Sequence, residues 1–78
     1  MDQKTRVAKD ITMFEENAKQ LPTTLPEPTA AVISLARQYY EDTNYYYDKH
    51  DYFTAFGCIN YAHGLLDAVR KTTEEQSP

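Results

Sequence analysis

Three polar residues in the last third of the chain have the spacing of a shared binding edge. Asn60, His63 and Asp67 are separated by three and four positions, which places them on one edge of an α-helix, where all three can point at a common ligand. We therefore predict Asn60, His63 and Asp67 as ligand-binding residues. The alternative is a structural network in which they satisfy tyrosine hydroxyls at the edge of a helical bundle.

Other chemistry is poorly supported by the residue pattern. Zinc sites normally use three or four ligands, and neither a His-x-x-x-His pair nor a cysteine pair is present. No nucleophile and base stand at a recognisable spacing, and the lone Cys58 lies in an apolar segment typical of a buried small hydrophobe. We expect no metal, no cofactor and no catalysis by this chain alone.

The segment that carries the binding edge is unusual because it has no charge. Charged residues make up 26% of the chain, but the fifteen residues from Tyr52 to Leu66 include no Asp, Glu, Lys or Arg. A helix without a solvated face must be surrounded. It is either the centre of a small helical domain or a helix that is covered by a second chain. Its core stripe comprises Tyr52, Ala55, Ile59, Ala62, Leu66 and Val69.

A second stripe lies opposite that core stripe on the same helix and contains two glycines. Gly57, Tyr61, Gly64 and Ala68 follow at spacings of four, three and four. A glycine inside a helix costs roughly 1 kcal/mol relative to alanine, which is tolerated where another backbone or a large ring must approach closely. We predict that this stripe is covered by a second copy of the chain, and that Tyr45, the one aromatic on the polar face of the preceding helix, joins the interface. The alternative is a monomer in which the first or second helix packs on the stripe.

Two further helices are predicted from apolar periodicity. The first, over 3–20, has the stripe Val7, Ile11, Phe14, Ala18 and Leu21, and the second, over 29–48, has the arc Val32, Leu35, Ala36, Tyr39, Thr43 and Tyr46. A link with three prolines separates them, and Leu21 and Leu25 are expected to cover the end of the bundle.

A tight turn should join the second helix to a third over 51–71. His50 is expected in the left-handed conformation, and Asp51 should cap the third helix. The fold class is therefore all-α, an up-and-down three-helix bundle of either hand. We expect one domain over 1–72 and a frayed tail over 73–78.

Composition narrows the partners and the location. The net charge is -4 and the eight basic residues are scattered, so a nucleic-acid partner is not expected. No apolar run of eighteen residues exists, and the N-terminal residues do not form the apolar run of a signal peptide. With a single cysteine, this pattern predicts a cytoplasmic protein with no membrane partner.

The stretch from Tyr39 to Ala68 resembles the archaeal domain-of-unknown-function family 357. The resemblance is carried by Tyr39, Tyr40 and Asp42, by the turn Asp51-Tyr52, and by the run Ala55-Phe56 through Tyr61-Ala62 to Gly64-Leu65-Leu66-Asp67-Ala68. It implies an up-and-down three-helix bundle and an archaeal source, and it brings no activity or catalytic residue. His50 departs from the pattern, where glycine would be expected in the turn.

These observations predict a non-catalytic helical interaction module that associates with itself or with another protein chain. Two alternatives remain open. One is a small-molecule- or nucleotide-binding domain that uses the edge formed by Asn60, His63 and Asp67. The other is an accessory subunit of an enzyme that a partner chain completes.

Overall fold

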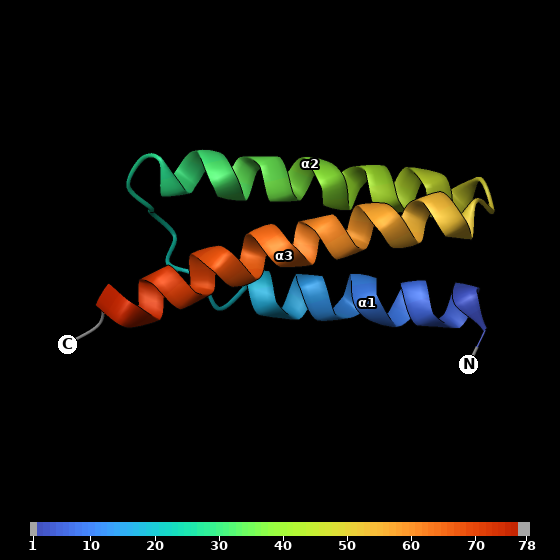
Figure 1. Ribbon diagram of the computed structural model, residues 1–78, viewed down its shortest axis with the longest axis horizontal. Helices are drawn as coiled ribbons and strands as arrows, with labels where there is room; N and C mark the ends of the chain where they lie inside the picture. Colours follow the sequence, from blue (N-terminus) through green and yellow to red (C-terminus); the bar gives the residue numbers. More distant parts are fainter. Residues whose placement is uncertain (1, 77–78) are drawn as a thin grey trace.

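A computed structural model describes the backbone of residues 2–76 and the side chains of residues 2–72. The described chain forms three helices, α1 (Gln3–Ala18), α2 (Thr29–Asp48) and α3 (Tyr52–Gln76), and contains no strand. They run alternately up and down, with a long connection after α1 and a tight turn after α2 (Figure 1). The predicted all-α three-helix bundle is confirmed.

α3 is the central element of the bundle. It lies between α1 and α2 and packs against both, most extensively against α2, whereas α1 and α2 contact each other least (Figure 1). The bundle is therefore flattened, with overall dimensions of 42 × 22 × 16 Å. This arrangement covers one side of α3 and leaves the opposite side without a neighbouring helix.

The buried core lies along the covered side of α3. Five of the six residues predicted for this stripe are buried, and Tyr52 is partly exposed. The apolar partners from the other helices are Val7 and Phe14 of α1 and Ile33 and Ala36 of α2, while Leu21 and Leu25 pack against the core at the end of the bundle as predicted. The buried α3 residues are Ala55, Ile59, Ala62, Leu66 and Val69.

Local sequence signals determine where the helices begin and turn. The side chain of Asp2 accepts a hydrogen bond from the backbone N–H of Thr5 at 2.7 Å, and that of Asp51 accepts one from Thr54 at 3.1 Å. His50 has a φ of 63°, so the left-handed turn residue is also confirmed. Pro28 precedes α2, and no side chain caps that helix.

The structure corrects which side of α2 faces the core. Leu35 is 40% exposed although the predicted arc included it, whereas Ile33, which lies outside that arc, is 7% exposed. The reason is that α2 packs against α1 as well as α3. Tyr40 of α2 stacks on Phe14 of α1, and this contact orients α2 so that Ile33 faces the core.

Two helix ends also differ from expectation. α1 ends at Ala18 rather than 20, and its last turn continues with Gln20 and Leu21 donating to carbonyls three residues back. α3 continues to Gln76 rather than 71 because no glycine or proline interrupts it there. The tail predicted over 73–78 lies outside the described side chains, and its last two residues lie outside the described backbone.

Candidate functional site

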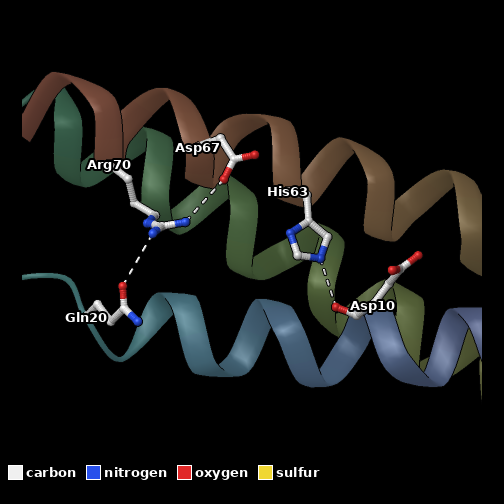
Figure 2. Close-up of polar contacts among 5 residues, drawn as sticks. All are labelled: Asp10, Gln20, His63, Asp67 and Arg70. Atoms are coloured by element: carbon white, nitrogen blue, oxygen red, sulfur yellow. Dashed lines mark hydrogen bonds and ion pairs between the residues drawn. The ribbon is translucent and has the colours of Figure 1, made fainter.

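The structure gives His63 and Asp67, two residues of the predicted ligand edge, different neighbours (Figure 2). His63 is half-buried, and its Nε2 lies 2.8 Å from the backbone carbonyl oxygen of Asp10 on α1. Because a carbonyl can only accept, Nε2 carries the proton and donates it. The ring also meets Phe14 edge-on, with the centroids 5.8 Å apart. His63 therefore links α3 to α1 through a hydrogen bond and a ring contact.

Asp67 lies farther along α3 and is exposed. Its Oδ1 is 3.6 Å from the guanidinium of Arg70, one helical turn away. Arg70 also donates to the side-chain oxygen of Gln20 at 3.3 Å, which links the end of α3 to the residues after α1 (Figure 2). An exposed pair of this kind contributes about 0–1 kcal/mol to stability, so it positions Arg70 more than it stabilises the fold.

Asn60 points elsewhere. It is exposed and lines a shallow cavity of about 260 Å³ together with Tyr61, Gly64 and Leu65. His63 and Asp67 do not line this cavity. The bonds on the predicted edge go to a backbone carbonyl and an arginine rather than to tyrosine hydroxyls. A ligand bound by Asn60, His63 and Asp67 together stays a prediction.

The side of α3 that faces away from the core forms a continuous surface that we call the outer face. All of its residues are exposed, and two of them carry large rings. Tyr61 is 55% exposed and Phe53 is 80% exposed. Phe53 was not among the predicted contact residues, although its place four residues before Gly57 in the uncharged run indicates this face. The outer face consists of Phe53, Gly57, Asn60, Tyr61, Gly64 and Ala68.

Neither glycine of the outer face is required by packing within the chain. A Cβ atom built on Gly57 or on Gly64 would meet nothing within 4 Å outside its own helical surroundings. Neither residue has a positive φ, so the backbone does not require glycine either. Within one chain, alanine would fit at both positions and would favour the helix by about 1 kcal/mol.

A scan against protein families matches residues 9–73 to the family described as Protein of unknown function (DUF357). The chain belongs to the DUF357 family. The match confirms the resemblance that the aromatic and glycine motifs of the last two helices indicated, and it extends over most of α1 as well. The sequence matches no curated protein. Family membership thus names no reaction, and the surfaces of the molecule must indicate what this DUF357 member does.

Tyr45 does not extend the outer face. It is 57% exposed on α2, where its ring meets Tyr46 edge-on at 5.2 Å and lies under the Lys49 ammonium at 5.6 Å. Tyr39 is the α2 residue whose ring packs on Tyr61, with the centroids 4.6 Å apart. Tyr45 comes six residues after Tyr39, which on an α-helix places the two side chains about 120° apart around the axis. Tyr45 therefore faces a different direction from Tyr39. Its role as a contact residue stays a prediction.

No activated nucleophile is found among the titratable side chains of residues 2–72. Burial, together with the charges of Asp42 and Asp51, raises the pKa of the Cys58 thiol, which keeps it protonated and unreactive at neutral pH. The hydrogen bond that the Tyr40 hydroxyl donates to Glu15 raises the pKa of Tyr40, and partial burial adds to this shift. This bond joins α1 to α2 where the two helices otherwise touch little.

Among the described residues, no group of three or more His, Cys, Asp or Glu side chains is arranged to hold a metal ion. No helix in the described part of the chain is long and apolar enough to cross a membrane.

Proposed function

We propose that this chain is a non-catalytic helical interaction module that pairs with a second copy of itself through the outer face of α3. The observation that supports this most strongly is the open space above Gly57 and Gly64. The two glycines weaken the helix without serving any contact inside the chain. A close approach by another helix gives them a purpose, because glycine allows two backbones to come nearer than any other residue does.

The spacing of the outer face fits such a pairing. Gly57, Tyr61, Gly64 and Ala68 alternate steps of four and three, which is the repeat that keeps one seam of a helix facing a partner helix. Two copies that use the same patch form a self-complementary, two-fold contact. The absence of charge between Tyr52 and Leu66 lowers the cost of removing this surface from water.

An antiparallel pairing of the two α3 helices fits the side-chain sizes best. If the two-fold axis passes between Asn60 and Tyr61, Gly57 of one copy lies opposite Gly64 of the other, and Phe53 lies opposite Ala68. A large ring then covers a small side chain at each end, and two glycines meet between the centre and each end. A parallel pairing would instead oppose Phe53 to itself and Tyr61 to itself. Antiparallel helices also place opposite ends of their dipoles together.

The size of the protein supports the same proposal. A domain of 78 residues can bury only a modest core, and chains of this size often gain stability by association. Large exposed rings grouped on one face are uncommon in proteins that stay monomeric. We keep the cytoplasmic location and the archaeal source as predictions that accompany this proposal.

Sedimentation equilibrium of the unmodified chain and of Gly64→Leu tests the proposal. We expect the unmodified chain to form dimers at micromolar concentrations and Gly64→Leu to be monomeric with its helix content retained, because the new side chain enters open space in the monomer. Ala31→Leu is the matched control: it adds apolar bulk at an exposed position on α2 and should leave association unchanged. A monomeric unmodified chain at high micromolar concentration would overturn the proposal, as would a Gly64→Leu variant that still dimerises.

A further inference from the structure

A hollow lies between α1 and α2, and no residue of α3 lines it. It consists of two adjoining cavities. One, of about 240 Å³, is lined by α1, by Lys19 directly after it and by α2. The other, of about 430 Å³, is lined by the end of α1, the connection that follows it and the first turns of α2. The volume of this second, larger cavity falls within the range of about 300–1,000 Å³ typical of small-molecule sites.

Two basic residues stand where the cavities join, since Lys19 and Arg37 line both. The order of Glu15 and Lys19 on α1 suits an ion pair across one helical turn. In the structure, however, the Glu15 carboxylate accepts the Tyr40 hydroxyl instead. Among the described side chains, no carboxylate lies within 4 Å of Lys19 or Arg37. Neither cation is thus paired directly with a carboxylate among the described side chains, although Glu15 lines the smaller cavity with them.

The larger cavity contains no carboxylate among its lining residues, whereas Glu15 lines only the smaller one. Its lining also includes the apolar side chains of Leu21, Leu25 and Ile33, which stand beside polar groups. A bound molecule would therefore meet positive charge on one side and hydrocarbon on the other. An anion would be repelled from the end of the hollow that Glu15 lines and attracted to the junction.

The two cavities have different walls. Phe14 and Tyr40, whose rings stack with their centroids 4.9 Å apart, line the smaller one. Pro22 and Leu25 of the connection after α1 line the larger one. A helix from another protein needs a continuous groove in which several turns can lie. Two cavities of this size fit a small molecule better.

We propose that this hollow binds a small amphipathic carboxylate, with its anionic head between Lys19 and Arg37 and its hydrocarbon body against Leu21, Leu25 and Ile33. The Arg37 guanidinium can hold both carboxylate oxygens with two parallel hydrogen bonds, and the Lys19 ammonium adds charge. The hydrocarbon body is stabilised by leaving water. The site is separate from the outer face of α3, so the pairing of two copies can fail without affecting it.

Titration of the isotope-labelled protein with decanoate, followed by two-dimensional NMR, tests this site. We expect saturable shifts of the backbone signals of Leu21, Leu25, Ile33 and Arg37. The double variant Lys19→Gln/Arg37→Gln should bind roughly tenfold more weakly or worse, since it removes charge-assisted hydrogen bonds. Lys9→Gln, at an exposed position of α1 outside the hollow, is the matched control and should bind as the unmodified chain does.

Two comparison ligands test separately the contribution of the charge and that of the hydrocarbon body. Decanol has the same hydrocarbon body without the charge, and acetate has the charge without the body; both should bind at least about tenfold more weakly than decanoate. Equal binding of decanol and decanoate would overturn the proposal, as would shifts confined to the outer face of α3. Thermal unfolding followed by circular dichroism checks that the double variant is folded, which keeps a loss of binding interpretable.

Discussion

Between Tyr52 and Leu66, the two sides of α3 share a lack of charge but differ in what covers them. On the inner side, Ile59 and Leu66 are fully buried between α1 and α2. On the outer side, Phe53 and Tyr61 are exposed and the glycines have open space above them. An uncharged helix segment therefore does not by itself mean that the segment is core. It indicates that both sides need cover, and in this chain the other two helices provide cover for only one side.

The largest expected difference between the two sides is the effect of removing apolar volume. Leu66→Ala should lower the free energy of unfolding by about 2–5 kcal/mol, because it leaves a cavity between three helices. The same change at Leu35, which is exposed on α2, should cost less than about 1 kcal/mol. Urea denaturation of both variants measures the difference. Equal losses would mean that the inner side of α3 is not the core.

A smaller effect of opposite sign is expected from alanine on the outer face. Gly57→Ala and Gly64→Ala should each raise the stability of the dilute monomer by about 0.8–1 kcal/mol, because alanine favours the helix and its methyl group meets nothing. Each should also weaken pairing, since the added methyl group holds the two helices apart.

Chemical denaturation at low protein concentration measures the gain in stability, and sedimentation measures the loss of pairing. Ala31→Gly, at an exposed helical position, is a control that should lose about as much stability as each alanine gains. A glycine-to-alanine change that destabilises the monomer would show that the position is packed within the chain after all.

The smallest effect concerns the bond from Tyr40 to Glu15, which supports the sparse contact between α1 and α2. The folded state raises the pKa of Tyr40 above its ordinary value of 10.0, chiefly through that bond. The stability that this bond contributes is therefore complete below about pH 10 and is lost as the pH rises through the folded-state pKa.

Tyr40→Phe should accordingly be less stable than the unmodified chain near neutral pH, and the gap should narrow above about pH 10. Urea denaturation at several pH values compares the two proteins, which share every other tyrosine and lysine. A gap that stays constant into the alkaline range would mean that the hydroxyl proton is not held by Glu15.

Much of the fold follows from short-range signals in the sequence. Asp2 and Asp51 cap their helices through residues three positions away, and His50 adopts its turn conformation next to a cap. Such features depend only on neighbouring residues, so they can be predicted from the sequence alone. The two opposite stripes of α3 were likewise predictable from helical periodicity.

Features that depend on three helices at once could not be predicted. The side of α2 that is buried was misplaced toward Leu35 because the contact with α1, through Phe14 and Tyr40, is not encoded in the periodicity of α2. The bond of His63 to the Asp10 carbonyl joins residues far apart in the sequence. At the hollow between α1 and α2, Lys19 is without an ion pair to Glu15 because Glu15 accepts from Tyr40, a residue far away in the sequence.

The most direct test of the outer face as a pairing surface is a nuclear Overhauser effect between the Phe53 ring and the Ala68 methyl group. The two residues are fifteen positions apart on one helix, about 22 Å, so within a single copy they are too far apart to give a signal. Antiparallel pairing through the outer face brings Phe53 of one copy against Ala68 of the other, and we expect the signal at concentrations where the chain is dimeric. A dimer that lacks this signal would contradict the account, as would a chain that stays monomeric.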